Sequence, residues 1–506
     1  MQTFDMIVLG SGPAGQRAAI QAAKELKVTW SEPETKMPAS FEEVDNYILT
    51  TKSFTDTGEA PGRGGPTGDI DAAFRQAAKS FEATYHWPFQ NHGMMLPSCA
   101  IADVRGDKVT IWTGAQGPFT TRDRVSDMLG IPKRNIDVIY IESAGCYGRL
   151  TSDDASEDAV LMSRAVGKPV RVQWMRADEH IWEPKGPQQL MMIRAAVNDQ
   201  GKITGWEFTG RTFAWTEAQG TPQLAERQLG QKNTAPYPAN PVGAGAVRQL
   251  YDIPNQKVVA SYIPWPQENP TPLRTNPLRS PGEPAGWYAS ESFVDEIASA
   301  LGKDPVEFRM DHLSADRRAA DVLRATAEKA MWKPRPSPAP ASNEPKASGR
   351  GVALISRGNT LVAAVAEVEV NRMNGNVAVK RVTVGFDCGL IINPDGLHFQ
   401  VEGNIIQGIS RALYEEVKFD SSGVKTVDWN SYPVITFRNL PEVEIVLLNH
   451  PEMPAYGAGE PGVVPIPGAI ANAIFDAVGV RLRQAPFTPQ RVLAGIKART
   501  TTSQRI

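Results

Sequence analysis

Two short stretches of this 506-residue chain carry residue types and spacings that could support chemistry. The first is VLGSGPAGQRAA, where Gly10, Gly12 and Gly15 follow an apolar run at G-x-G-x-x-G spacing. Such a turn lets the backbone approach a pyrophosphate, and Glu32 stands about twenty residues on, where a ribose-binding acid is expected. The motif predicts dinucleotide binding, with a glycine turn that binds no ligand as the alternative.

The second stretch is GAGEPG, which places Glu460 between glycines and prolines. It leads into a segment that ends at Gly479 and has apolar residues at helical spacing, namely Ile470, Ile474, Ala477 and Val478. The Glu460 carboxylate therefore lies on a loop before a helix. It is a candidate catalytic group, and the alternative is a capping or surface acid.

Composition excludes several classes of function. With 41% hydrophobic residues, 22% charged residues and a net charge of −3, the chain is globular, and we expect two or three domains and no nucleic-acid partner. It has no apolar run of about eighteen residues and no signal-peptide pattern, so we expect no membrane segment and a cytoplasmic location. The three cysteines, Cys99, Cys146 and Cys388, are too scattered for an iron–sulfur cluster, so any cluster must belong to a partner.

Short alternating runs and helical patterns together predict an α+β fold with large mixed sheets. GDIDAAFRQAAKSFEATY predicts a helix that begins at the N-cap Asp69 and carries Phe81 on its apolar face. Hairpins are predicted at Gln200–Gly201 and Asn374–Gly375. The Pro- and Ser-rich segment 333–350 predicts an exposed connector between two domains.

A helix is also predicted after NPDG. Its apolar residues recur every four positions: Leu397, Val401, Ile405 and Ile409. A different face carries three amides: Gln400, Asn404 and Gln407. These amides are either functional groups or a solvated helix face.

Seven long stretches, in order along the chain, carry a resemblance to a known family. They are HWPFQNHGMMLPSCAIADV, VTIWTGAQGPF, ESAGCYGR, SRAVGKPVRVQWMRADEHIWEPKGP, LRSPGEPAGWYASESFVDEIASALGKDPVEFR, DCGLIINPDGLHFQVEGNIIQGISRALYEEV and YGAGEPGVVPIPGAIANAIFDAVGVRLRQAPFTPQRV. From about residue 20 onward the chain resembles the molybdenum-cofactor-binding large subunit of the xanthine oxidase and aldehyde oxidoreductase family. The nearest branch is the isoquinoline-oxidoreductase and nicotinate-dehydrogenase-like one.

The resemblance implies a domain organisation. Residues 1–17 resemble instead the start of the flavin- and NAD-dependent disulfide reductase and transhydrogenase family. Neither the later parallel strands nor the redox cysteine pair follows, so FAD or NAD binding is not favoured. The expected parts are 1–17 as a fusion or truncation remnant, 18–80 as a truncated α/β hammerhead remnant and connector, 81–332 as the first molybdenum-cofactor-binding domain, 333–350 as the linker, and 351–506 as the second such domain.

The resemblance also implies roles for single residues. Glu460 matches the general base that deprotonates a molybdenum-bound hydroxide during attack on an aldehyde or an N-heterocycle, with water as the oxygen source. Gln90 matches the glutamine that donates to the apical oxo ligand, and Arg279 matches an arginine near substrate and cofactor. The remaining expected cofactor-binding residues are Gln116, Gly117, Gly145, Cys146, Tyr147, Gly148, Gln400 and Gly459.

Cofactor, partner and substrate follow from the same resemblance. It implies molybdopterin or its cytosine dinucleotide form, and a small [2Fe-2S] subunit that accepts the electrons. Purine-oxidising members carry an acid after the glycine loop, where this chain has Leu150 and Thr151, so an aldehyde or N-heteroaromatic substrate is favoured. Two alternatives remain: a catalytically silent remnant of such a large subunit, and a flavin or NAD enzyme fragment.

Overall fold

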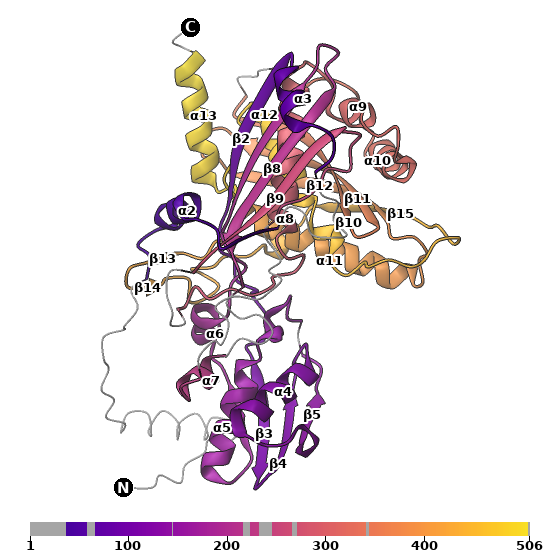
Figure 1. Cartoon of the computed structure of the whole chain (residues 1–506). Coiled ribbons are helices and arrows are strands. Elements are labelled where there is room, and N and C mark those ends of the chain that lie inside the picture. The colour runs from indigo at the N-terminus through magenta and orange to yellow at the C-terminus, as the bar shows by residue number, and fades with distance from the viewer. Residues whose placement is uncertain are drawn as a thin grey trace.

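The computed structural model describes residues 37–57, 66–143, 145–215, 223–231, 245–265, 271–340 and 344–503. The glycine fingerprint at 1–17 and the expected hammerhead strand and helix at about 18–32 lie outside these residues. The described chain forms a smaller body and a larger body, which lie at the bottom and the top of Figure 1. Helices and strands are mixed in both, as the predicted α+β class requires.

The smaller body is built on a four-stranded sheet of order β5-β4-β3-β6. Apolar side chains on one face of its strands pack with two helices into a separate hydrophobic core. The alternating runs KVTIWTG, NIDVIYIES and PVRVQWM each contain one strand of this sheet. The elements are β3 (Cys99–Arg105), β4 (Lys108–Thr113), α4 (Pro118–Leu129), β5 (Ile136–Tyr140), α5 (Asp154–Val166) and β6 (Val170–Gln173), with α7 (Leu224–Gln228) against α5.

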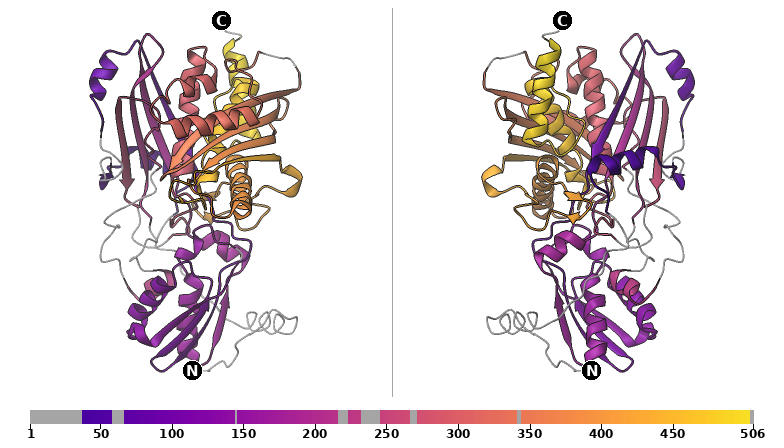
Figure 2. Two further views of the ribbon diagram at one scale, coloured as in Figure 1. Left: turned by 90° about the vertical axis from the view of Figure 1, so that its right-hand side faces the viewer. Right: turned by 90° about the vertical axis from the view of Figure 1, so that its left-hand side faces the viewer.

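A five-stranded sheet of order β1-β9-β8-β7-β2 forms one side of the larger body (Figure 2). The predicted hairpin at Gln200–Gly201 is confirmed, and Gly201 has a positive φ of 76° in its turn. Helix α8 (Glu283–Ala300) packs on this sheet, where the rings of Trp206 and Phe293 lie 5.5 Å apart. The strands are β1 (Thr55–Thr57), β2 (Lys79–Trp87), β7 (Gln189–Val197), β8 (Ile203–Phe213) and β9 (Asn255–Ile263).

A second sheet, of order β10-β11-β12-β15, forms the other side of the larger body (Figure 2). Helix α12 (Ile466–Val478) lies on one face, and α10 (Arg317–Lys329) contacts the sheet on the other. A Cβ at Gly351 would lie 2.2 Å from the backbone nitrogen of Ala473, so α12 approaches the sheet too closely for a side chain there. The strands are β10 (Lys346–Arg357), β11 (Thr360–Asn371), β12 (Val377–Asp387) and β15 (Glu442–Leu448), and the hairpin at Asn374–Gly375 is confirmed.

The helix predicted from Asp69 is only partly correct. Asp69 is its N-cap and accepts a hydrogen bond from the Ala72 amide at 2.8 Å, but α3 (Ile70–Arg75) ends before Phe81. Phe81 lies in β2, because residues 79–87 also alternate between apolar and polar and pair with β7. The other elements are α2 (Phe41–Thr50), α6 (Arg176–Trp182), α9 (Pro305–Met310), α11 (Pro394–Leu413), β13 (Phe419–Asp420), β14 (Gly423–Val424) and α13 (Pro489–Ser503).

The segment 333–350 is not an exposed connector along its whole length. Its last five residues begin β10, and Arg335 binds Asp476 of α12 with two hydrogen bonds of 2.6 Å. Buried side chains from before and after the segment belong to one hydrophobic cluster. Part of this polar segment is therefore bound to α12 through the ion pair of Arg335 and Asp476 and is not separated from the core. The limits 81–332 and 351–506 stay a prediction from the sequence.

Candidate active site

Glu460 precedes the 3-10 turn Pro461–Val463, which leads into α12, and it contacts residues from distant parts of the chain. The Ser280 amide donates to Glu460 Oε1 at 3.0 Å, and the Ser280 hydroxyl donates to the Glu460 backbone carbonyl at 3.0 Å. Arg357, the last residue of β10, donates to Glu460 Oε2 and forms an ion pair with Glu283 at 3.0 Å. The predicted helix after Glu460 is confirmed, including its end at Gly479. The Glu460 carboxylate is therefore held on both oxygens.

Two opposing effects determine the charge of Glu460. Burial raises its pKa, but the hydrogen bonds from Arg357 and the Ser280 amide, with the charges of Arg357 and Arg279, outweigh burial. The net pKa lies below that of an ordinary glutamate, so the side chain is ionised at neutral pH. With 38% of the side chain exposed, the carboxylate is both anionic and accessible. These are the properties of a general base.

The backbone carbonyl of Gly459, the residue before Glu460, accepts hydrogen bonds from Arg279 and from α11. Arg279 Nε donates to it at 3.1 Å, and Gln400 Nε2 donates at 2.7 Å. Asn404 is buried and lies 3.4 Å from the same carbonyl, and Gln407 accepts from Arg279 at 2.9 Å. The amide face of α11 therefore points to the Glu460 loop. The alternative, a purely solvated helix face, is wrong for these amides.

The glycine loop from Gly145 to Gly148 reaches this place from the smaller body. Three of its residues have positive φ: Gly145 at 61°, Tyr147 at 52° and Gly148 at 106°. A Cβ at Gly148 would lie 2.0 Å from the Pro277 carbonyl oxygen, so only glycine fits there. The Tyr147 carbonyl accepts from the Arg279 amide at 2.9 Å, which ties the loop to the segment that holds Glu460.

Gln116 and Gly117 lie at the start of α4, in the smaller body. Gly117 is the N-cap of this twelve-residue helix and offers no side-chain cap to its amides. Gln116 is exposed, and its Oε1 lies 3.4 Å from the Cys146 sulfur. The structure thus brings this turn next to the glycine loop, although neither turn directly contacts Glu460 through a described hydrogen bond.

Gln90 is a buried residue. Its Nε2 donates to the backbone carbonyls of Arg411 and Glu415, at 3.1 and 3.0 Å. Its Oε1 is buried and has no partner among the described residues. The side chain lines a cavity that it shares with Arg279 and Arg411 and that has room for about one water molecule.

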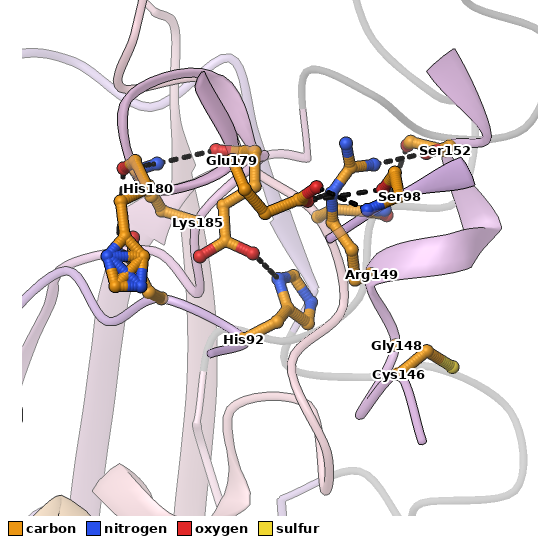
Figure 3. Close-up of polar contacts among 12 residues, drawn as sticks. His92, Ser98, Cys146, Gly148, Arg149, Ser152, Glu179, His180 and Lys185 are labelled. Carbon is orange, nitrogen blue, oxygen red and sulfur yellow. Dashed lines mark hydrogen bonds and ion pairs between the residues drawn. The ribbon is translucent and has the colours of Figure 1, made fainter. Parts of the chain in front are cut away.

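A buried ionic network supports the glycine loop, and the sequence did not predict it. Arg149 Nε donates to Glu179 Oε1 at 2.6 Å, and the same arginine forms an ion pair with Asp154 at 3.0 Å. Glu179 also accepts from the Ser98 amide at 2.7 Å (Figure 3). Burial raises the pKa of Glu179, but Arg149 and Ser98 outweigh it and lower the net pKa. The available signal was an arginine directly after the last loop glycine.

His92 is a second residue that sequence reasoning missed. Its Nε2 lies 2.9 Å from the Pro277 carbonyl, and because a carbonyl only accepts, this nitrogen carries the proton. Burial lowers the pKa of His92 to about 3, so the ring is neutral. His92 therefore fixes the same carbonyl oxygen that a Cβ at Gly148 would meet.

Two further features of the described residues bear on the predicted chemistry. No group of three or more His, Cys, Asp or Glu side chains that could hold a metal ion occurs among them. One described stretch, Pro461–Val478, is long and apolar enough to span a membrane, but 94% of it is buried inside the protein. It packs as the core helix α12.

Comparisons with known proteins agree with this architecture. Residues 59–313 and 294–441 each match the family model of a molybdopterin cofactor-binding domain. The chain is 38% identical over 492 residues to one of the nicotinate dehydrogenase subunits of Pseudomonas putida, which covers 95% of this chain and 40% of that protein. It is 31% identical over 435 residues to the beta subunit of isoquinoline 1-oxidoreductase from Brevundimonas diminuta, over 84% of this chain and 52% of the relative. The chain thus spans about half or less of these relatives.

Solved structures show the same fold. Quinoline 2-oxidoreductase from Pseudomonas putida 86 superposes with a TM-score of 0.76 at 17% identity, over 96% of this chain and 84% of that chain. Aldehyde oxidoreductase from Desulfovibrio gigas gives a TM-score of 0.74 at 17% identity, over 96% of this chain and 68% of that chain. The chain belongs to the xanthine oxidase family and is related to its molybdopterin-binding subunits.

Proposed function

We propose that the chain is the molybdopterin-binding subunit of a molybdenum hydroxylase that oxidises an aldehyde or an N-heteroaromatic compound with water as the oxygen source. The observation that carries this proposal is the anionic, accessible Glu460, held by Ser280 and Arg357. Gln400 of α11 donates to the neighbouring Gly459 carbonyl. A silent remnant has no need to keep this carboxylate ionised and accessible.

The residues present fit an oxygen-rich, anionic cofactor. The glycine loop leaves no room for a side chain at Gly148, the N-terminus of α4 has no side-chain cap, and Gln90 keeps a buried polar atom without a partner among the described residues. Backbone amides at a helix start and in a loop with positive φ are suited to oxyanions. Gln90, Arg279, Gln400 and the turns at 116–117 and 145–148 would hold the cofactor, in its molybdopterin or cytosine dinucleotide form.

When bound, the cofactor supplies two-electron oxidation and oxygen transfer. The chain's own contribution is proton transfer and positioning. Glu460 accepts a proton from the attacking oxygen, and its low pKa keeps it free to do so at neutral pH. Arg279 fixes the Glu460 loop through the Gly459 carbonyl, so that the carboxylate does not move away from the reacting atoms.

The electron acceptor and substrate are proposed by analogy with the relatives. Nicotinate and isoquinoline stand in the names of two of them, and aldehyde stands in the names of others. We propose a small [2Fe-2S] subunit as the partner that takes up the electrons, and we do not propose FAD or NAD. Leu150 and Thr151 after the glycine loop favour an aldehyde or N-heteroaromatic substrate over a purine.

The first test is the molybdenum content of the chain by elemental mass spectrometry, after co-expression with an iron–sulfur partner in a host that makes the cofactor. We expect about one molybdenum per chain, and the same content in Glu460→Gln. The variant should lose activity by about 10²-fold to 10⁴-fold, the usual contribution of a general base. A folded wild-type chain without molybdenum would support the silent-remnant alternative.

A further inference from the structure

Arg411 of α11 is a buried cation with two hydrogen-bond donors that have no partner among the described residues. The residue is 1% exposed, and its Nη1 donates to the Arg279 carbonyl at 3.0 Å. Nε and Nη2 have no acceptor in the part of the chain that the structure describes, and none of the ion pairs found there includes Arg411. Burial lowers the pKa of Arg411 to about 10, so the group is still charged at neutral pH.

A comparison within the chain shows how unusual this arrangement is. Arg309 is buried to a similar extent, but its Nε donates to Glu291 at 2.8 Å and a second acid, Asp295, lies 3.7 Å away. Buried charges are normally paired in this way, because an unpaired one is costly to desolvate. Arg411 lacks, among the described residues, the counterion that Arg309 has.

The acids around Arg411 do not replace that counterion. The charge of Glu415 interacts with Arg411, but the two side chains form no ion pair among the described residues. Glu415 instead accepts a hydrogen bond from the Tyr432 hydroxyl at 2.9 Å, and burial raises its pKa. The charge of Glu460 also interacts with Arg411, but Glu460 is bound to Arg357. Arg279 adds a second positive charge close enough to lower the pKa of Arg411 further. The local charge therefore favours an anion.

Arg411, Arg279 and Gln90 line one cavity together with Trp87 and Trp215. Because it has room for about one water molecule, it takes the oxygen atoms of a larger molecule rather than a whole ring. Gln90 Oε1 adds a buried acceptor for an N–H or O–H group, or for a water, beside that oxygen.

We propose that Arg411 is the anchor of an oxyanion-binding subsite beside Glu460. This inference rests on the proposed function and deepens it. Two sources supply the required chemistry: a carboxylate on the substrate, and an anionic oxygen of the molybdenum cofactor. Arg411 binds one of them through Nε and Nη2, the pair of donors that matches a carboxylate or phosphate oxygen pair.

The first arm of the test uses the full chain without cofactor and measures urea unfolding. Arg411→Met removes a charge that has no counterion among the described residues, so the variant should unfold at the same urea concentration as the wild type or higher. Arg309→Met is the control and should unfold at a clearly lower concentration, because it leaves Glu291 buried without its cation. If Arg411→Met unfolds as early as the control, Arg411 is a structural residue and the proposal is wrong.

The second arm separates the two sources. Nicotinate and its neutral amide, nicotinamide, are titrated into the wild type, Arg411→Lys and Arg411→Met, with tryptophan fluorescence as the signal, since Trp87 and Trp215 line the cavity. A substrate carboxylate predicts that nicotinate binding weakens at least tenfold in Arg411→Met, much less in Arg411→Lys, and that nicotinamide binding does not change.

Molybdenum and phosphorus content per chain, measured after co-expression, is the third arm. If Arg411 binds an oxygen of the cofactor, nicotinate binding should not depend on the charge at position 411. The molybdenum and phosphorus content should then fall at least tenfold in Arg411→Met and be largely kept in Arg411→Lys. Unchanged nicotinate binding together with unchanged content would overturn the proposal. Because the wild-type content is measured in parallel, a chain that never takes up molybdenum refutes the proposed function, while the nicotinate arm still decides the role of Arg411.

Discussion

Replacing Arg357 by methionine tests how the chain keeps Glu460 ionised. Arg357 donates to Glu460 Oε2, and the side chains of the pair are 25% and 38% exposed. Burial raises the pKa of Glu460, and the lowered net pKa depends on Arg357 first and on the Ser280 amide and Arg279 after it. Without Arg357 the remaining donor and the weaker charge oppose the same burial, so the pKa of Glu460 must rise.

The size of the rise follows from the exposure of the pair. An opposite charge within hydrogen-bond reach lowers a carboxyl pKa by roughly 1–3 units. Because more than a third of the Glu460 side chain is exposed, solvent screening places the effect at the lower end, at about one unit or about 1.4 kcal/mol. A general base must be ionised to act, so the acid limb of the pH profile of kcat/KM should move upward by about one pH unit.

The assay combines this pH profile with urea unfolding of the cofactor-free chain. A carboxylate whose folded-state pKa is depressed stabilises the fold above its unfolded-state pKa of about 4.3, and this contribution is lost as the pH falls through the folded-state pKa. The stability difference between wild type and Arg357→Met should therefore be largest near neutral pH and shrink in acid. Part of it should vanish in a Glu460→Gln background, and the remainder belongs to Glu283.

Arg381→Met is a matched control outside the site. Arg381 binds Glu367 at 2.6 Å, and these side chains are 18% and 37% exposed, close to the values for Arg357 and Glu460. This variant should leave the acid limb of the pH profile in place. An acid limb that stays equally unmoved in Arg357→Met, at full molybdenum content, would refute the view that Arg357 sets the charge of Glu460.

Four further substitutions test the supports of the site and fold. Gly148→Ala places a Cβ 2.0 Å from the Pro277 oxygen at a φ of 106°, so it should cost at least about 1–3 kcal/mol in urea unfolding and reduce molybdenum content; wild-type values for both would contradict it. Burial lowers the pKa of His92 to about 3. Below the ordinary His pKa the unfolded chain therefore binds a proton that the folded chain does not, which destabilises the fold. His92→Gln should lose less stability in acid than the wild type, and equal losses would refute this. Gly351→Val should lower the free energy of unfolding by about 1–3 kcal/mol, because its side chain collides with α12. Gly403→Ala, with open space around its Cβ, should be neutral or stabilising. The reverse order would contradict the packing described for β10.

Local patterns predicted much of the fold. The hairpins at Gln200–Gly201 and Asn374–Gly375, and the helix that ends at Gly479, depend on turns, caps and periodicity within about twenty residues, which a sequence displays directly. Phe81 shows the limit of this reasoning. Its segment fits both a helical and an alternating pattern, and pairing with β7, more than a hundred residues away, decided for the strand.

The site shows the same limit more strongly. Glu460 was identified from its own loop, but its partners Ser280 and Arg357 are 180 and 103 residues distant in sequence. No spacing rule connects them, because they meet only when two sheets and α12 have packed. For the amides of α11, periodicity predicted that they share one helix face but not what that face contacts. The fold shows that Asn404 on this face is buried rather than solvated.

The segment 277–280 connects the parts of the site. The Pro277 carbonyl accepts from His92 and faces Gly148, the Arg279 amide donates to Tyr147, and the Ser280 amide donates to Glu460. The glycine loop belongs to the smaller body and Glu460 to the larger one, so this short backbone segment links the two. Arg411 also contacts this segment, because its Nη1 donates to the Arg279 carbonyl at 3.0 Å. A ligand oxygen bound at Arg411 would therefore act on the segment that positions both the loop and the base, which couples ligand binding to the geometry of proton transfer.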